Sequence, residues 1–375
     1  MAEKILLSIA IPTWNRAVSL ESLLNNIFHQ IKETKASVEV CISNNGSTDN
    51  TREVVMNFKD KYPYLIKYNE NEKNLGFDIN LLKAIEIASG QFIWTFGDDD
   101  LIIRGGLCEV IKLIKRVPAE KTGLIFIRRE EYFINKKTGE KVVCCNTVDK
   151  EKSKILTMKK KDIIGMYSPD PGFMSALVFN GRILKNIIKE EKSFIDSGIG
   201  ICYIHVLLHS LMFLKYRGLD AISLNKVIIL QELPIYKFFI EDTFRLNYKE
   251  QKRLNNLLLS CKYMDNNYAS LFIKSDKNLR KKIIFDMVKM RALTSFNYSS
   301  YADCLKLFFQ YSPFFDALLF SFTFSLLILF PAILLRPAYK TFLIVKYGRG
   351  WRTEWTLAYT PTKGSRRWNF NGEAP

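Results

Sequence analysis

The sequence lacks the cysteine spacings that mark disulfide-rich domains and zinc sites. Seven cysteines stand at positions 41, 108, 144, 145, 202, 261 and 304, and no two of them form a CxxC pair. An odd number without such pairs indicates neither a disulfide framework nor a zinc ribbon. A small-residue cleavage site is also missing, because the first apolar run ends at Pro12. We therefore expect a first strand instead of a signal peptide, and a reducing cytoplasm as the setting.

Two nucleotide-binding fingerprints are missing as well. No G-x-G-x-x-G follows the first apolar run, and no G-x-x-x-x-G-K-[ST] occurs in the chain. Dinucleotide and P-loop chemistry thus lose their main support. Acidic residues are scarce beside basic ones, since 55 Lys and Arg against 38 Asp and Glu give a formal net charge of +17. This surplus suits nucleic acid, a phosphorylated ligand or a membrane surface.

What the chain does contain is an alternation of strand and helix patterns. Apolar runs at 5–12, 37–43, 64–70, 91–97 and 123–128 are typical of strands, and helical periods fill 18–31, 50–60 and 79–89. Such an order predicts an α/β fold whose mainly parallel sheet is flanked by helices. Three strand ends carry polar signals, PTWNR at 12–16, SNNGSTDNT at 43–51 and GDDD at 97–100. Loops at the carboxyl ends of parallel strands line one site.

Three adjacent carboxylates follow the fourth apolar run. Asp98, Asp99 and Asp100 repel one another unless a cation lies between them. Mg²⁺ or Mn²⁺ takes one or two carboxylates and fills its other positions with water and phosphate oxygens. The alternative is a solvated acidic turn that caps a helix at 105–116.

The motifs IPTWNR, SNNGSTDNT, NEKNLGFDIN, AIEIASG and FGDDD decide between these readings. Over roughly residues 5–130 this series resembles family 2 glycosyltransferases with the Rossmann-like GT-A fold, and most of all abequosyltransferase-type enzymes of O-antigen synthesis. The resemblance implies inverting transfer of a hexosyl or deoxyhexosyl group from a nucleotide-sugar. It also implies a divalent metal, Mg²⁺ or Mn²⁺, at the donor diphosphate.

The resemblance assigns donor and metal residues by position. The donor-binding set is Pro12, Thr13, Asn15, Arg16, Asn44, Asn45, Asn74, Gly76 and Asp98, and the metal set is Asp99 and Asp100. Two motifs depart from the family pattern. Amides stand at 44 and 45 where carboxylates are usual, so the base stays open, and Gly97 replaces the first acid of the D-x-D-D motif.

Inverting transfer also needs a base that removes the acceptor's proton. The usual Glu-Asp pair is absent, and we expect His205 as the base with Asp196 as the second choice. His205 and His209, spaced i, i+4 on an apolar helix, are equally expected simply to pack. The acceptor set implied by position is Asp170, Gly172, Phe173 and Tyr203. Residues 128–146 are expected to form a hairpin.

We expect residues 1–235 to form the glycosyltransferase domain, with a donor half at 1–130 and an acceptor half at 131–235. Residues 236–375 then form a helical region with an uncharged run of 19 residues at 317–335. Such a run approaches the length of a membrane span. Basic, aromatic sequence after it favours a re-entrant or in-plane helix over a full span, with a buried hairpin or an oligomer contact as alternatives.

These features together predict an enzyme at the cytoplasmic face of the cell membrane. Its expected partners are a nucleotide-sugar donor, a polyprenyl-linked saccharide acceptor and anionic lipids. A processive polysaccharide synthase is one alternative, but GSRRW has Gly364 where such enzymes have the Gln of Q-x-x-R-W. A nucleic-acid-binding protein is the other, but most Phe residues fall in apolar runs instead of among Lys and Arg. We therefore expect no nucleic-acid partner.

Overall fold

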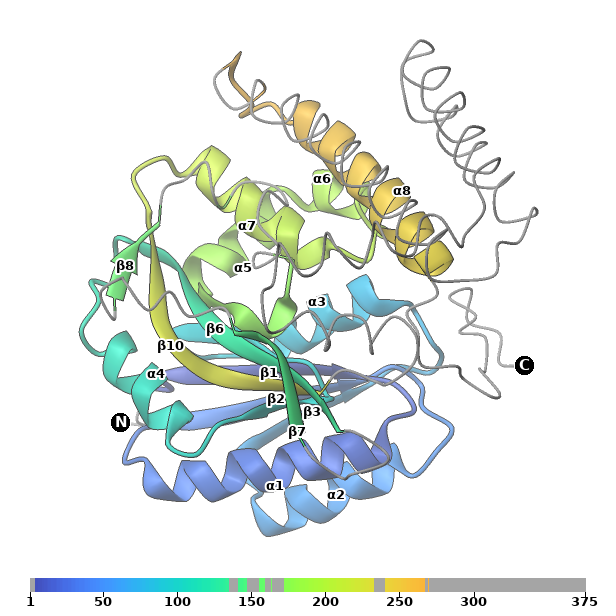
Figure 1. Ribbon diagram of the computed structural model, residues 1–375, viewed down its shortest axis with the longest axis vertical. Coiled ribbons are helices and arrows are strands. Elements are labelled where there is room, and N and C mark those ends of the chain that lie inside the picture. Colours follow the sequence, from blue (N-terminus) through green and yellow to red (C-terminus); the bar gives the residue numbers. More distant parts are fainter. Residues whose placement is uncertain are drawn as a thin grey trace, which may run out of the picture.

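A computed structural model of the protein describes residues 4–134, 141–146, 155–158, 163, 172–232, 240–266 and 269 (Figure 1). The strands are β1 Leu7–Thr13, β2 Val38–Asn44, β3 Ile66–Glu70, β4 Phe92–Thr95, β5 Asp100–Ile102, β6 Thr122–Ile134, β7 Lys141–Asn146, β8 Ile155–Thr157, β9 Leu177–Asn180 and β10 Asp220–Glu232. The helices are α1 Ala17–Glu33, α2 Thr51–Lys61, α3 Phe77–Ile87, α4 Gly106–Ile114, α5 Gly181–Glu190, α6 Lys192–Asp196, α7 Ile204–Lys215 and α8 Ile240–Leu259, with a short 3-10 turn at Met174–Ala176.

All the strands belong to one sheet. Its order is β3-β2-β1-β4-β9-β6-β10-β5, with β7 on β6 and β8 on β10. The pairs β3-β2, β2-β1 and β1-β4 are parallel. Strand β9 runs antiparallel to both β4 and β6, β10 is parallel to β6, and β5 is antiparallel to β10.

The expected α/β sheet is therefore confirmed, but its expected mainly parallel character is wrong. Only the first four strands joined by helices are uniformly parallel, and the sheet as a whole is mixed. The antiparallel members include two short strands, β9 with four residues and β5 with three, whose partners lie far away in the sequence. The expected hairpin at 128–146 is present, because β7 pairs antiparallel with β6.

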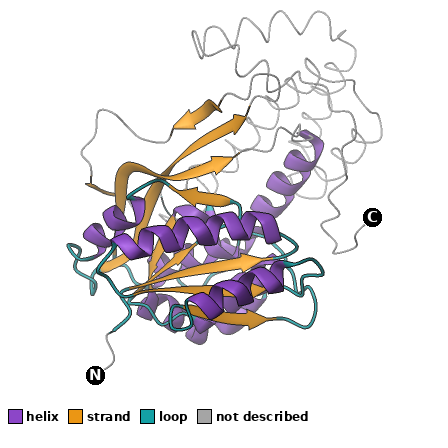
Figure 2. Cartoon of the chain, turned by 90° about the horizontal axis from the view of Figure 1, so that it is seen from below, coloured by secondary structure: helices purple, strands orange, loops and turns teal. Residues whose placement is uncertain are grey.

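Helices cover both faces of the sheet and bury two apolar clusters. Helices α1, α2 and α4 pack on one face, and α3, α5, α6 and α7 pack on the other. Figure 2 shows the first of these faces, with its helices in front of the sheet and running roughly along the strands. Neighbouring residues of a central strand divide between the clusters, as Ile9 and Ala10 do in β1. This alternation is the period of two expected of a strand with helices on both sides.

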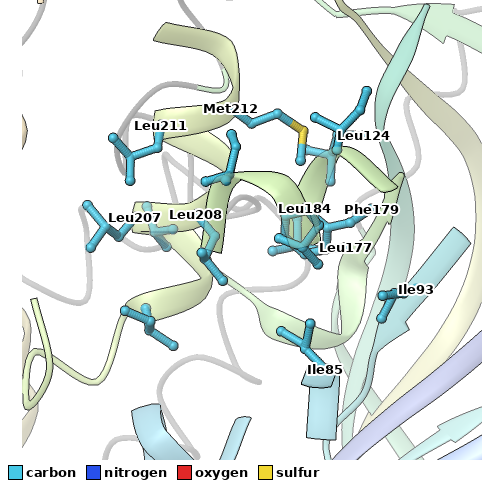
Figure 3. Close-up of a cluster of buried hydrophobic side chains, with 14 of the residues drawn as sticks. Ile85, Ile93, Leu124, Leu177, Phe179, Leu184, Leu207, Leu208, Leu211 and Met212 are labelled. Atoms are coloured by element: carbon cyan, nitrogen blue, oxygen red, sulfur yellow. The ribbon is translucent and has the colours of Figure 1, made fainter. Parts of the chain in front are cut away.

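Helix α7 is buried all round, because every residue from Ile204 to Leu214 is buried. Its side chains meet the sheet and the neighbouring helices in the cluster of Figure 3. The labelled members of that cluster are Ile85, Ile93, Leu124, Leu177, Phe179, Leu184, Leu207, Leu208, Leu211 and Met212. A helix packed on every side holds its first turn rigidly, and His205 lies in that turn.

The division of the chain at residue 235 stays a prediction, since residues 233–239 lie outside the described part. The apolar run at 317–335 lies outside it as well, so its contact with membrane, protein or a second copy also stays a prediction. Within the described ranges, no helix combines the length and apolar character needed to cross a bilayer.

Candidate active site

Three loops meet at the carboxyl edge of the parallel strands, as expected from the sequence. The loop after β1 is tied to the loop after β2 by several hydrogen bonds, two of which involve Asn15. The backbone N–H of Asn15 donates to Ser47 Oγ at 2.9 Å, and that of Thr48 donates to Asn15 Oδ1 at 2.7 Å. Asn15 has a φ of +51°, a left-handed conformation that Asn tolerates better than most residues. Pro12 lies inside β1, buried and in register with Ser43 of β2.

The acidic loop after β4 contacts the loop after β1. Thr13 Oγ1 donates to Asp98 Oδ2 at 2.8 Å, and Arg16 Nη1 lies 2.6 Å from Asp99 Oδ2. Burial raises the pKa of Asp98 to about 6. The Arg16 charge lowers this pKa and the Asp99 charge raises it, so the effects of the two charges oppose each other. The Asp99 side chain is 53% exposed, the most accessible of the three.

Asp100 turns inward instead of facing the opening. It begins β5, where it pairs with Gln231 of β10, and only 2% of it is exposed. Ser175 Oγ donates to Asp100 Oδ2 at 2.5 Å and accepts from the Gly97 N–H at 2.8 Å. Asp100 Oδ1 is buried without a hydrogen-bond partner. Burial, together with the neighbouring Asp99 charge, raises the pKa of Asp100 to about 8.

This arrangement fits a divalent cation for which the protein supplies only some of the ligands. Among the described residues, no group of three or more His, Cys, Asp or Glu side chains is arranged to enclose a metal. Mg²⁺ and Mn²⁺ bound with nucleotides need only one or two carboxylates, since phosphate and water supply the rest. The accessible carboxylate of Asp99 meets that need.

Asn44 and Asn45 are buried and hydrogen-bonded to the protein itself. Asn44 Nδ2 donates to the Tyr68 hydroxyl at 2.9 Å, and its Oδ1 accepts from the Ser47 N–H at 3.1 Å. Asn45 Nδ2 donates to Asn74 Oδ1 at 2.8 Å. Only 0% and 3% of Asn44 and Asn45 are exposed. The two amides thus brace the loops of the expected donor site, and reading a base there remains a prediction.

Two glycines shape the same loops. Gly46 has a φ of +66°, and a Cβ there would lie 2.7 Å from the backbone carbonyl carbon of Lys73. A side chain would push the loop after β2 away from the loop after β3. Gly76 has a φ of +86° and precedes α3 as its N-cap. Both positions require the conformational freedom of glycine.

His205 lies in the first turn of α7, beneath the segment that leads into β9. Its Nε2 is 2.9 Å from the carbonyl oxygen of Gly172, and its ring packs edge-on against Phe77. Burial lowers the pKa of His205 to about 4, so the ring is neutral at pH 7. A neutral ring that donates from Nε2 has its lone pair on Nδ1, and Nδ1 is buried without a partner.

The other expected acceptor-side residues divide into two groups. Tyr203 lies beside His205, with ring centroids 6.0 Å apart, and burial raises its pKa to about 12. Phe173 lies under the Arg129 guanidinium, 4.4 Å from the ring centroid. Asp196 is exposed and paired with Lys192 at 2.7 Å. Asp170 lies outside the described residues.

Ser175 and Asp78 were not expected from the sequence. Ser175 holds the acidic loop from the side of β9, and Trp94 Nε1 donates to its carbonyl at 2.7 Å. Asp78 accepts backbone N–H groups from the loop before α7. Their only signal is position, since Ser175 comes just before a strand and Asp78 lies just inside a helix. Neither position distinguishes a functional contact from an ordinary one.

The fold and the three loops agree with the comparison to known families. Residues 8–177 match the model of Glycosyl transferase family 2. The expected resemblance is thereby confirmed. The matched range covers the loops after β1, β2 and β4 and ends as β9 begins.

Relatives with curated names extend the comparison. Over 223 residues the chain is 33% identical to the abequosyltransferase RfbV of Salmonella typhimurium, covering 56% of this chain and 61% of that protein. Over 127 residues it is 31% identical to the GalNAc(5)-diNAcBac-PP-undecaprenol beta-1,3-glucosyltransferase of Campylobacter jejuni, covering 33% of this chain and 39% of that protein. The chain thus spans less than two thirds of either relative.

Solved structures support the fold. S. aureus TarS 1-349 in complex with UDP-GlcNAc matches with a TM-score of 0.55 at 15% identity, over 82% of each chain. The mannosyltransferase PcManGT of Pyrobaculum calidifontis in complex with GDP-Man and Mn²⁺ matches with a TM-score of 0.50 at 14% identity, over 95% of this chain and 85% of that one. At such identities the likeness shows a shared GT-A-like architecture.

Proposed function

We propose that the protein is an inverting glycosyltransferase that moves a sugar from a nucleotide-sugar to a lipid-linked saccharide in surface-glycan synthesis. The observation that carries the proposal is the acidic loop held against Thr13 and Arg16 at the carboxyl edge of a family 2 domain. The RfbV relative is named for the transfer of abequose, and the Campylobacter relative for a diphosphate-undecaprenol acceptor. These names support a related donor and a related acceptor for this chain.

The bond changes follow from the class of reaction. The acceptor hydroxyl oxygen bonds to the anomeric carbon on the face opposite the nucleoside diphosphate, whose bond to that carbon breaks. The hydroxyl proton passes to a base on the protein. Negative charge grows on the leaving diphosphate. Arg16, which is paired with Asp99 of the acidic loop, is the side chain that we expect to stabilise this charge.

A divalent cation, when bound, neutralises charge on the diphosphate. Asp99 is the residue we expect to hold it, because its carboxylate is accessible. Asp98, hydrogen-bonded to Thr13, is expected to contact the donor ribose. Asp100 acts from behind, where Ser175 and β10 fix it and it in turn fixes the loop.

His205 is proposed as the base, with Asp196 as the alternative. The neutral ring and unpartnered Nδ1 of His205 support a role as proton acceptor. Its burial opposes that role, because an acceptor hydroxyl must reach the ring. Asp196 lies on α6, where it is exposed and paired with Lys192. Substitutions at His205 and Asp196 distinguish the two choices.

Thermal shift measurements test the donor assignment. The full-length protein is titrated with UDP-, GDP-, CDP- and dTDP-sugars in the presence and absence of Mn²⁺. A ligand at 100 times its dissociation constant stabilises the folded state by about 2.7 kcal/mol. We expect one nucleotide class to raise the melting temperature, and chelation to weaken that effect. No shift with any nucleotide-sugar, at concentrations up to several millimolar, would contradict the proposal.

We also propose that the acceptor is lipid-linked and that the protein acts at the cytoplasmic face of the membrane. Nucleotide-sugars are cytoplasmic, and a polyprenyl-linked acceptor keeps its saccharide at that surface. The net charge of +17 favours anionic lipid head groups. Transfer to a short synthetic polyprenyl-diphosphate saccharide, measured by mass change, would support the acceptor class, and equal transfer to the free saccharide would contradict it.

A further inference from the structure

Asp78 is a buried carboxylate that joins two parts of the site. It lies in the first turn of α3, directly after the donor-side segment at 74–77, and only 2% of it is exposed. Its Oδ2 accepts backbone N–H groups of Gly200 at 2.8 Å and Cys202 at 3.0 Å, and its Oδ1 accepts that of Ile204 at 3.3 Å. These donors belong to the loop before α7, more than 120 residues away in sequence.

The loop that Asp78 holds contains two residues with a left-handed backbone conformation. Gly200 has a φ of +86° and Cys202 a φ of +61°, a left-handed conformation that costs a non-glycine residue free energy. With this backbone, successive N–H groups point to one side and form a cradle for an anion. The carboxylate also lies at the N-terminal turns of both α3 and α7, where the helix dipoles favour negative charge.

The loop carries the acceptor-side residues directly. Tyr203 is between two of the N–H donors, and His205 follows the last of them. His205 then reaches Gly172, three residues before the serine that holds the acidic loop. A continuous set of contacts thus runs from the donor-side segment through Asp78 and the loop to the acidic residues.

We propose that Asp78 is a positioning residue for transfer, which fixes the loop at 200–204 so that Tyr203 and His205 keep their place relative to the donor. This inference rests on the proposed glycosyltransferase function. A carboxylate can hold this loop because its two oxygens accept from the three backbone N–H groups of Gly200, Cys202 and Ile204. The Asp78→Asn substitution keeps the size of the side chain but replaces one acceptor with an NH₂ group that faces those donors.

The test compares Asp78→Asn with a matched control, Glu39→Gln. Glu39 is also a buried carboxylate, 3% exposed, and it accepts from Ser8 Oγ and the Ser89 N–H at 2.6 Å each, away from the loop before α7. Both substitutions remove a buried charge, so both are expected to lower the melting temperature. Only Asp78→Asn is expected to speed hydrogen exchange in peptides that cover 200–204, by about tenfold or more.

Kinetics provide the second readout. A small misplacement of reacting groups costs on the order of 100-fold in rate. We expect Asp78→Asn to lower kcat by about that factor while the affinity for the donor nucleotide, measured with UDP, GDP, CDP and dTDP, changes less than about threefold. Asp78→Glu, which keeps both oxygens, should restore part of kcat. Equal loss of kcat and nucleotide affinity, or the same split in Glu39→Gln, would overturn the proposal.

Failure of this inference is distinguishable from failure of the proposed function. If the wild-type protein binds no nucleotide-sugar, the function is wrong, and exchange at 200–204 still decides whether Asp78 holds the loop. If Asp78→Asn does not fold, hydrogen exchange in the wild-type protein tests the proposal instead. Its Gly200 amide lies at an exposed residue, yet we expect slow exchange there, and rapid exchange overturns the proposal.

Discussion

Asp99 has the most exposed side chain of the three residues in the acidic loop. Its carboxylate is half exposed and paired with Arg16. We expect Asp99→Asn to lower transfer by about 100-fold or more, since neutralising diphosphate charge is worth several kcal/mol. The melting temperature should stay close to that of the wild type, because exposed substitutions change stability little. Initial rates with the donor found by thermal shift, alongside calorimetry, measure both.

A control for Asp99→Asn is Asp60→Asn, which removes an exposed carboxylate at the end of α2. This variant should turn over normally. Near-normal transfer by Asp99→Asn would show that no essential cation or donor contact depends on that carboxylate.

The pH dependence of transfer, compared between the wild type and variants at His205 and Asp196, identifies the base. A base works only when unprotonated, so activity falls as the pH falls through its pKa. The pKa of His205, lowered by burial to about 4, lies below the usual value near 6.5. If His205 is the base, kcat should stay level from pH 8 to about 5 and fall only near pH 4. His205→Gln should then remove this limb together with most of the activity.

The outcome has a clear alternative in Asp196→Asn. If that variant is inactive and His205→Gln retains its rate, the exposed carboxylate on α6 is the base, and His205 serves to hold Gly172. A limb near pH 6.5 in the wild type that is absent from His205→Gln would show an imidazole that water reaches during turnover.

At the scale of elements, Glu191 fastens several helical segments together. It lies between α5 and α6, and it accepts from Lys215 Nζ of α7 and the Tyr263 hydroxyl, each at 2.6 Å. Lys262 Nζ is 2.9 Å from its other oxygen. Burial raises the pKa of Glu191, but these hydrogen bonds outweigh it and hold the pKa at about 2.

The lowered pKa fixes the sign of a stability change with pH. The stabilisation from Glu191 is complete above its unfolded pKa of about 4.5 and disappears as the pH falls towards 2. Glu191→Gln should lower the free energy of unfolding by about 2 kcal/mol at pH 7 and make it less sensitive to acid. Urea titrations at pH 7, 4 and 3 measure both effects. Glu86→Gln, at an exposed pair with Lys83, is the control that should change little.

The sequence predicted those elements that its periodicity describes. The expected strand at 5–12 is β1 at Leu7–Thr13, and the expected helix at 18–31 is α1 at Ala17–Glu33. These segments are long and bury one clear face or both. Strand β9 has four residues, and its place between β4 and β6 depends on partners far away in sequence. No local pattern encodes such a pairing, so the mixed sheet could not be predicted.

The candidate site also has features that the sequence predicted and features that it could not predict. Parallel strands brought the expected loops together, so the contacts of Thr13 with Asp98 and of Arg16 with Asp99 agree with that expectation. Which way each side chain faces could not be read from the sequence. Asp100 faces inward because β5 pairs with β10, and Asn44 is enclosed because Tyr68 and Ser47 occupy its polar atoms. Both depend on register.

At the scale of the whole molecule, the basic surplus leads to a prediction about membranes. We expect the full-length protein to float with vesicles that contain 30% phosphatidylglycerol, and not with neutral vesicles, because the charge of +17 favours an anionic surface. Raising the salt to 0.5 M should weaken binding only in part if the uncharged run at 317–335 inserts between lipids.

The paired substitution Leu326→Lys and Leu329→Lys tests that run. Adding charge at two apolar positions should reduce vesicle binding at high salt, while thermal stabilisation by the donor is retained. A protein that stays soluble without detergent and ignores anionic vesicles would show that the run packs inside the molecule or against a second copy.

The place of β9 in the sheet also sets the order in which the chain can fold during synthesis. Phe92 of β4 pairs with Asn180 of β9, so 88 residues separate partners that lie side by side. At about 5–20 residues per second, a ribosome needs roughly 4–18 seconds to make that length. Until then β4 is an open edge whose backbone groups can pair with another chain. The domain therefore closes late, and a nascent chain halted before residue 180 holds its acidic loop on an unfinished sheet.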